Sequence, residues 1–452
     1  MRYSNGLRRE HKNTQRKKEV VAGRTLICSF DLARRKHAYH VVDAERDVLA
    51  RGHVPHSLEG MEQLLKELET LRQNQKYDRL VFFMEGASYF WMPIVSLLVR
   101  KGYTYRLVQN RAVKHQRLLA GQGGHKNDPR DAAHIATLAS TLHFTFTQLP
   151  FRPEWIALRA YALEYQQLVD LVTAEKNRIH AFLGTILPGY YGIFVEPFGE
   201  SSLAILEALP HVMQLETEAF VEQVRQRFQG QNLQAKRCRA VWEYAHSENP
   251  WGYVEARAAL SERIATAAAR IQLLSQQQDT VREQLLAAYR QIPYHENADS
   301  IHGSSSVENA VLLEILGDPK DFDAARTLVR VAGLDPGEQA SGEYEGKSKI
   351  TKVGRTQLRR AAVSATMAVL KSRRNPDFVR RLFGLQQRQE HRLTELQALC
   401  ACASKYLRTV WWLCVTDTRY EPKVAHHGFA RETSTGYSRT TNTAQEPVLT
   451  IE

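Results

Sequence analysis

Four carboxylates in the first third of the chain are placed where they could do chemistry together. Asp31 ends the apolar run RTLICSFD and Glu85 ends the run LVFFME, so each is expected at the end of a buried strand. Asp128 and Asp131 open an expected helix, and side chains three residues apart on a helix share a face. The positive end of the helix dipole also favours acids there.

Carboxylates that lie together without partners raise one another's pKa. Two divalent cations about 3.5–4 Å apart remove this conflict and create a site for phosphoryl transfer, so Mg²⁺ or Mn²⁺ is the expected cofactor. Taken singly, each acid has a simpler interpretation, because aspartate is common in turns and as a helix cap. The joint pattern, two strand ends and one helix face, is what indicates a metal site.

A serine in the last third of the chain is the second candidate for chemistry. Ser341 precedes a glycine in a glycine-rich loop, and such a serine can approach a phosphate closely. Six cations follow without an acid between them and could hold phosphates: Lys347, Lys349, Lys352, Arg355, Arg359 and Arg360. No histidine adjoins the serine as a base, so its activation must come from elsewhere in space. On the residues alone, an ordinary loop serine before a solvated or phosphate-binding helix start is the simpler interpretation.

The elements expected around the acids alternate between strands and helices. Strands are predicted at 24–31, 36–42, 47–54, 80–85 and 103–110, and helices at 57–71, 90–101 and 128–142. Ser57 is expected to cap the first helix. The order βββαβαβα over residues 23–150 is the order of an RNase H-like (RuvC-like) α/β domain, a mixed sheet with helices on its faces.

Residues 151–293 are expected to be helical after a linker that contains Pro150 and Pro153. Apolar residues recur at steps of three, four or seven from Leu158 to Leu183 and from Leu260 to Ile292, which predicts two long helices. Such seams form a coiled coil, within one chain or between chains, or the core of a helical bundle. Both arrangements satisfy the pattern.

A third, mainly α-helical region is expected at 294–416. Helices are predicted at 307–316, 327–332 and 356–415, with a break near Asn375 and a Gly- and Lys-rich loop at 335–354. Both ends of the chain are polar. The basic arm 1–22 and the Thr- and Ser-rich tail 417–452 are therefore predicted to be disordered.

The overall charge points to a polyanionic partner. A formal net charge of +12 and a pI of about 9.4 favour nucleic acid. No apolar run approaches the roughly 20 residues that cross a bilayer, and the basic N-terminus lacks the apolar stretch of a secretory signal. The five scattered cysteines fit a reducing compartment, so a cytoplasmic location, in a bacterium and associated with the nucleoid, is expected.

The motifs around the acids resemble those of the DEDD transposases of bacterial insertion sequences, the IS110 type, whose relatives include the Piv-like DNA invertases. The segments SFDLA at 29–33, FMEGASY at 83–89 and KNDPRDAA at 126–133 resemble motifs of that family's RuvC-like domain. The resemblance implies that the family's four metal-binding acids are Asp31, Glu85, Asp128 and Asp131. Lys126, which precedes the last two acids, and Arg130, which lies between them, are expected to contact nucleic acid.

The C-terminal region resembles the transposase domain of the same family. In the segment AGLDPGEQASGEYEG at 332–346, the serine of the Ser-Gly pair matches the family's nucleophile, which implies that Ser341 forms a phosphoserine link with DNA. The segment from Ile301 resembles the family's helix-hairpin-helix-like motif, with His302 and Ser305 in place of its proline and second glycine. The resemblance further implies a structured noncoding bridge RNA that pairs with donor and target DNA. It also implies a homo-oligomer, dimer or tetramer, in which the acids of one chain meet the serine of another.

The sequence therefore predicts a metal-dependent DNA recombinase with a covalent serine step. Two other classes of protein remain open. A RuvC-like structure-specific endonuclease would use only the acids, and a covalent protein–DNA adduct would exclude it. A non-catalytic nucleic-acid-binding protein of transposase origin would bind RNA while failing every cleavage assay.

Overall fold

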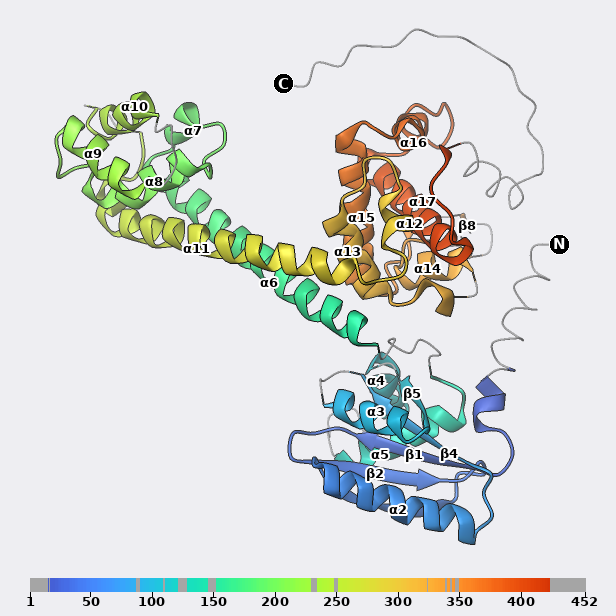
Figure 1. Ribbon diagram of the computed structural model, residues 1–452. Helices are drawn as coiled ribbons and strands as arrows, with labels where there is room; N and C mark the ends of the chain where they lie inside the picture. Colours follow the sequence, from blue (N-terminus) through green and yellow to red (C-terminus); the bar gives the residue numbers. More distant parts are fainter. Residues whose placement is uncertain are drawn as a thin grey trace. The chain divides into compact units, whose positions relative to one another are not determined.

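The computed structural model describes residues 15, 17–86, 90–108, 110–120, 128–144, 152–228, 234–247, 251–322, 324–337, 340–341, 344–345 and 349–422. For residues 110–111, 128, 340–341 and 344–345 this description covers the backbone alone. The chain divides into two compact units, Met1–Arg152 and Pro153–Glu452 (Figure 1). No helix among the described residues is long and apolar enough to cross a membrane.

The first unit is built on a five-stranded mixed sheet in the order β3-β2-β1-β4-β5. Its strands are β1 (Thr25–Asp31), β2 (Lys36–Val42), β3 (Val48–Pro55), β4 (Arg79–Glu85) and β5 (Thr104–Val108). The first three strands are antiparallel, whereas β4 and β5 run parallel to β1. The apolar runs that form β1 and β4 are buried on both faces, as strands covered by helices must be.

Helices cover the two faces of this sheet. On one face α2 (Leu58–Asn74) and α3 (Trp91–Arg100) share a core with Leu26 and Phe30, and on the other α5 (Asp128–Ser140) shares a core with Ile27. Ser57 caps α2 by accepting a hydrogen bond from the Gly60 amide, which confirms the predicted helix start. The expected mixed α/β domain is present, with one helix more than the sequence predicted, α4 (Asn110–Leu119).

Two long antiparallel helices, α6 (Pro153–Ile186) and α11 (Arg257–Tyr289), open the second unit. Leu158 of α6 shares a core with Leu285 of α11, and Ile179 shares another with Ile264, so the start of one helix packs against the end of the other. The apolar seams predicted from the sequence therefore pack against each other within one chain (Figure 1).

Four short helices, α7 (Tyr190–Ile193), α8 (Glu200–Ala208), α9 (Thr217–Arg227) and α10 (Ala235–Ala245), join α6 to α11. They share one core with the end of α6 and the start of α11. The sequence predicted no organisation for this middle segment. Its short helices carry too few apolar positions for a clear period.

The rest of the second unit is a helical body. It consists of α12 (His295–Asp299), α13 (Ser306–Leu316), α14 (Ala325–Val331), α15 (Thr356–Ser372), α16 (Pro376–Gln386) and α17 (Glu395–Thr416). The helix predicted at 356–415 is thus broken twice, at Asn375 as expected and again before Thr394, which caps α17 with a capping box. Two short ladders interrupt the helices, β6 (Pro336–Gly337) with β9 (Lys349–Ile350) and β7 (Ala340–Ser341) with β8 (Tyr344–Glu345).

Both predicted disordered ends need correction where the structure describes them. Residues 417–422 are docked on the region of α12, because Asn297 Nδ2 donates to the Thr418 carbonyl at 3.0 Å and Arg419 pairs with Glu296 at 2.6 Å. At the other end, residues 17–21 are helical and Lys17 Nζ donates to the Leu142 carbonyl at 2.8 Å. Residues 1–14 and 423–452 lie outside the described residues.

Candidate active site

Two of the predicted acids end neighbouring parallel strands. In the register of β1 and β4, Phe30 lies opposite Met84, so Asp31 and Glu85 follow at the same edge of the sheet. Phe30 and Met84 belong to the core beneath α2 and α3. Because side chains alternate along a strand, Asp31 and Glu85 face the opposite side, where both are partly buried.

Helix α5 covers that opposite side and brings a third acid to it. Ser29, two residues before Asp31, donates from Oγ to the Ala132 carbonyl of α5 at 2.7 Å, and Ile135 packs with Ile27 of β1. Asp131 precedes Ala132 and is only 2% exposed. The structure thus brings Asp31, Glu85 and Asp131 to one side of the sheet. The side chain of the fourth acid, Asp128 at the start of α5, lies outside the described residues.

Asp131 is held by a neighbour that the sequence did not single out. Arg117 of α4 places its Nε 2.7 Å from Asp131 Oδ1. The other oxygen, Oδ2, is buried and has no hydrogen-bond partner within the described part of the chain. A buried carboxylate oxygen without a partner is costly, and a cation would remove that cost.

A carboxylate donor set of this kind suits a hard divalent cation. Within the described residues, no group of three or more acidic, histidine or cysteine side chains is gathered closely enough to hold a metal as it stands. The side chain of Asp128, at the start of α5, lies outside the described residues and is therefore not covered by this statement. The neighbouring His134 is nearly buried, and burial lowers its pKa, against the opposing influence of Asp131.

A histidine pair, in which His37 is buried and His56 is partly buried, contacts the segments that follow the two strand-end acids. His37 is fully buried and its Nδ1 accepts from the Ala33 amide at 3.2 Å, in the turn after Asp31. Its Nε2 lies 2.7 Å from His56 Nδ1 and therefore donates to it, since Nδ1 of His37 already accepts. The His56 ring packs edge-on against Phe90, five residues after Glu85. Burial, and then the charge of His56, lower the pKa of His37 to about 4.

The predicted nucleophile lies on the short β7–β8 ladder, where Ser341 pairs with Tyr344. Its side chain is outside the described residues. The base of the loop is anchored: Thr351 donates to Asp335 through both its amide, at 2.9 Å, and its hydroxyl, at 2.6 Å. Gly354, with φ +154°, leaves room for the Val331 carbonyl, which a Cβ would meet at 2.3 Å. Ser341 belongs to the second unit, whereas the four acids belong to the first.

The predicted phosphate-binding cations differ in their surroundings. Lys126 and Lys347 are outside the described residues, and Arg130, Lys349 and Lys352 are exposed. Three arginines of the run already have partners: Arg355 donates to the Ile315 carbonyl at 3.0 Å, Arg359 donates to the Ala332 carbonyl at 3.0 Å, and Arg360 pairs with Asp170 at 2.7 Å. These contacts join the start of α15 to α13, α14 and α6.

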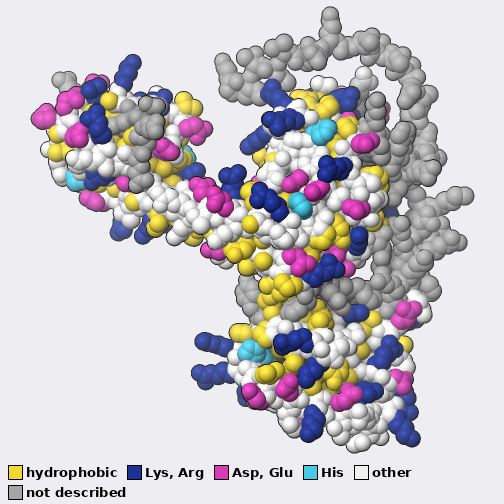
Figure 2. Space-filling model, in the orientation of Figure 1, with side chains coloured by type: hydrophobic (Ala, Val, Ile, Leu, Met, Phe, Trp, Pro, Cys, Tyr) yellow, Lys and Arg dark blue, Asp and Glu magenta, His cyan; other side chains and the backbone are white. Residues whose placement is uncertain are grey.

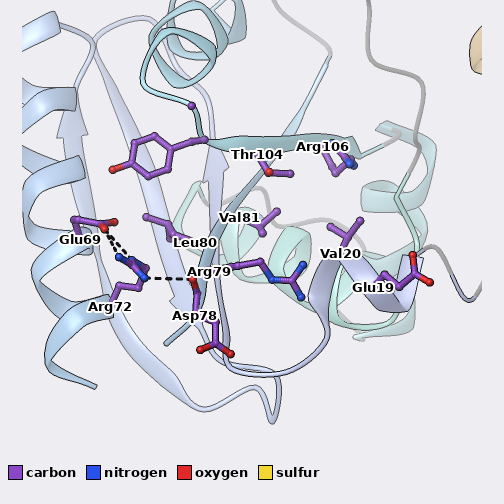
Figure 3. A pocket seen from close by; sticks show the side chains of 12 residues that line it. Glu19, Val20, Glu69, Arg72, Asp78, Arg79, Leu80, Val81, Thr104 and Arg106 are labelled. Carbon is purple, nitrogen blue, oxygen red and sulfur yellow. Dashed lines mark hydrogen bonds and ion pairs between the residues drawn. The ribbon is translucent and has the colours of Figure 1, made fainter. Parts of the chain in front are cut away.

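A pocket lies at the opposite end of the sheet from the acids, around the first residues of β4 and β5 (Figure 3). Its arginines are engaged: Arg72 pairs with Glu69 at 2.6 Å and Arg79 donates to the Ala22 carbonyl at 2.9 Å. Glu85 lies at the far end of β4 from this pocket, and Asp31 ends the parallel strand β1 at the same edge as Glu85, so the cavity is separate from both acids.

Two family models match the chain, and the first extends from the first unit into α6 of the second. Residues 28–188 match a model of DEDD transposases of the IS110 type, and residues 295–381 match the transposase IS116/IS110/IS902 family. No curated protein matches the chain. The four acids fall inside the first match and Ser341 falls inside the second. The chain therefore belongs to the IS110-type transposases, enzymes that cleave and rejoin DNA.

Proposed function

We propose that Asp31, Glu85, Asp128 and Asp131 hold Mg²⁺ or Mn²⁺ in an RNase H-like site that cleaves DNA. The observation that carries this proposal is the convergence of two strand ends and α5 on one side of the sheet, with the buried Asp131 Oδ2 left without a described partner. A bound divalent cation would polarise the phosphodiester and stabilise the oxygen that leaves.

The protein's own groups orient the acids for this task. Arg117 holds Oδ1 of Asp131 and leaves the buried Oδ2 without a described hydrogen-bond partner. The His37–His56 pair stabilises the turn after Asp31 by accepting a hydrogen bond from the Ala33 amide. Carboxylates that neighbouring side chains already hold in place need little reorganisation when a cation binds.

We assign the covalent step, in which a strand is cut and held for rejoining, to Ser341. Its hydroxyl oxygen would attack a DNA phosphorus and form an ester, while one bond from phosphorus to a deoxyribose oxygen breaks and that oxygen leaves as a hydroxyl. Attack by a hydroxyl of another strand would then restore the diester and release the serine. The ester conserves the energy of the original bond, which hydrolysis would lose to water. The support for this role is the Ser-Gly motif within the matched transposase region.

Two further proposals concern an RNA partner and the association of this chain with copies of itself. A structured noncoding RNA that pairs with donor and target DNA is consistent with a net charge of +12. A dimer or tetramer is consistent with Leu171 and Leu273, which are 51% and 56% exposed on the helix pair α6–α11. Arg270 on α11 lies 3.4 Å from Glu175 on α6, so the two leucines lie at nearly the same level of the pair. Exposed leucines on the outer side of a helix pair are suited to contact between chains.

The experiment that tests the metal site measures strand cleavage on DNA carrying the element's ends, with the element's noncoding RNA present. Asp31→Asn and Asp131→Asn should each lower the cleavage rate by about 10³-fold or more, because a metal ligand supplies several kcal/mol of transition-state stabilisation. Asp78→Asn is the matched control, since it removes the same charge just before β4, at the opposite end of the sheet from Glu85. Full activity of Asp131→Asn, or of the wild type in excess chelator, would exclude this site.

A further inference from the structure

A second group of cations lies where α16 packs against α17 in the helical body. Arg380 and Arg381 lie on α16, Arg388 follows that helix, and Lys405 and Arg408 lie on α17. We call these five residues the α16–α17 cluster. The cluster is not apparent from the sequence, because its members are spread over 29 positions and two helices.

The charge of this region is poorly balanced. Residues 371–408 contain nine Lys and Arg against three Asp and Glu. The acid within α16, Asp377, is engaged by Arg380 at 3.0 Å and by the Tyr420 hydroxyl at 3.3 Å. Among the described residues, no ion pair reaches the other four members of the cluster.

The cluster members also lie close enough to repel one another. Lys405 Nζ lies 4.8 Å above the Phe378 ring, and Arg408 Nε is buried without a hydrogen-bond partner in the described chain. Burial lowers the pKa of Lys405, and Arg381 and Arg380 lower it further against the influence of Asp377. Like charges gathered in this way are stabilised by a polyanion that lies across them.

The contrast with the run from Lys347 to Arg360 is informative. Its arginines hold backbone carbonyls and Asp170, whereas Arg381 and Arg388 are exposed at the surface and lack such partners among the described residues. Figure 2 shows Lys and Arg side chains over α16 and the end of α15. Arg388, Lys405 and Arg408 also lie beyond residue 381, where the second family match ends.

We propose that the α16–α17 cluster binds the sugar–phosphate backbone of duplex DNA. Guanidinium groups pair with phosphate oxygens through two parallel hydrogen bonds, and a cluster on two packed helices can contact successive phosphates. Duplex DNA is chosen as the occupant because transposases act on DNA. The proposal rests on that DNA-acting function and is independent of the metal site.

The test is fluorescence anisotropy of the full chain with a labelled duplex, in EDTA, between 50 and 200 mM NaCl. Arg381→Gln with Arg388→Gln should lower the slope of log affinity against log salt by about 2 and weaken binding at 150 mM by about tenfold or more, since each lost phosphate contact contributes about 0.9 to the slope. The matched control is Arg225→Gln with Arg239→Gln. It removes the same charge from exposed arginines that pair with Glu222 and Glu218, and it should bind like the wild type.

A second measurement needs no substitution and covers the case in which the double variant unfolds. In the wild type, duplex DNA should protect Arg381 and Arg388 from an arginine-specific dicarbonyl reagent, as read by peptide mass spectrometry. Labelling that is equal with and without DNA, or a double variant that binds like its control, would overturn the proposal. A larger loss on a labelled RNA hairpin than on the duplex would assign the cluster to RNA instead. The binding assay is run in EDTA and does not depend on the metal site, so the two proposals fail separately.

Discussion

The acids and the serine are presented by two different kinds of structure. Asp31 and Glu85 end seven-residue strands inside a five-stranded sheet with a helix layer on each face. Ser341 lies on a ladder of two residues per strand, anchored to a helical body at its base. A metal site needs its oxygens fixed to within about 0.5 Å, which a buried sheet edge provides. A serine that forms an ester needs room for a phosphate beside its hydroxyl.

The largest expected effect concerns the helix pair of the second unit. Ile271 is 2% exposed in the core shared by α6 and α11. Ile271→Asp would bury a charge without a partner and should lower the free energy of unfolding by about 4 kcal/mol or more. Hydrogen exchange along α11 measures this loss. Unchanged protection along α11 would show that the pair does not depend on its apolar seam.

Leu273→Asp is the matched control for the same helix, two residues away. Leu273 is 56% exposed, so its replacement should leave the fold of the chain intact. If contacts between chains use the outer side of the pair, this variant should shift the wild-type oligomer toward the monomer in light scattering. A monomeric wild type, with and without nucleic acid, would contradict the oligomer that we propose.

The next effect concerns the support of the acids in the first unit. The pKa of His37 is lowered to about 4 by burial and by His56, whereas an unfolded histidine titrates near 6.5. The unfolded state therefore binds more protons between these values, and stability must fall as the pH drops from 6.5 toward 4. Between pH 7 and pH 5 the loss should be about 2 kcal/mol.

Hydrogen exchange of the peptide that covers residues 31–42 measures this loss, after correction for the intrinsic exchange rate. His37→Gln keeps a polar side chain but removes the titration, so its protection should change little over the same range. An equal loss of protection in both proteins would assign the pH dependence to other groups.

The smallest effect concerns the cation run after the serine. Arg360 and Asp170 are both well exposed, so Arg360→Ala should cost less than about 1 kcal/mol of stability. If a phosphate replaces Asp170 when DNA binds, the same variant should lower the salt slope of binding by about 1. An unchanged slope would leave Arg360 with the role of joining α15 to α6.

The sheet and the placement of its acids were predictable because they depend on local patterns. Buried apolar runs predicted β1 and β4. The alternation of side chains along each strand then places Asp31 and Glu85 on the same face of the sheet. The partner of Asp131 was not predictable, because Arg117 reaches it only through the packing of α4, whose basic sequence NRAVKHQRLL reads as a nucleic-acid-binding segment. The two apolar seams predicted the long helices but not whether they pair within one chain. That choice depends on how the intervening helices turn the chain back.

The covalent step is the central claim, and one denaturing gel tests it most directly. End-labelled DNA is incubated with the wild type, Ser341→Ala and the control Ser348→Ala, which removes another serine seven residues later. We expect a slow-migrating protein–DNA band for the wild type and Ser348→Ala, with the label mapped to the peptide that contains Ser341. Ser341→Ala should bind DNA normally and form neither this band nor recombinant product. A band that persists in Ser341→Ala, or that maps to a tyrosine such as Tyr344, would contradict the account.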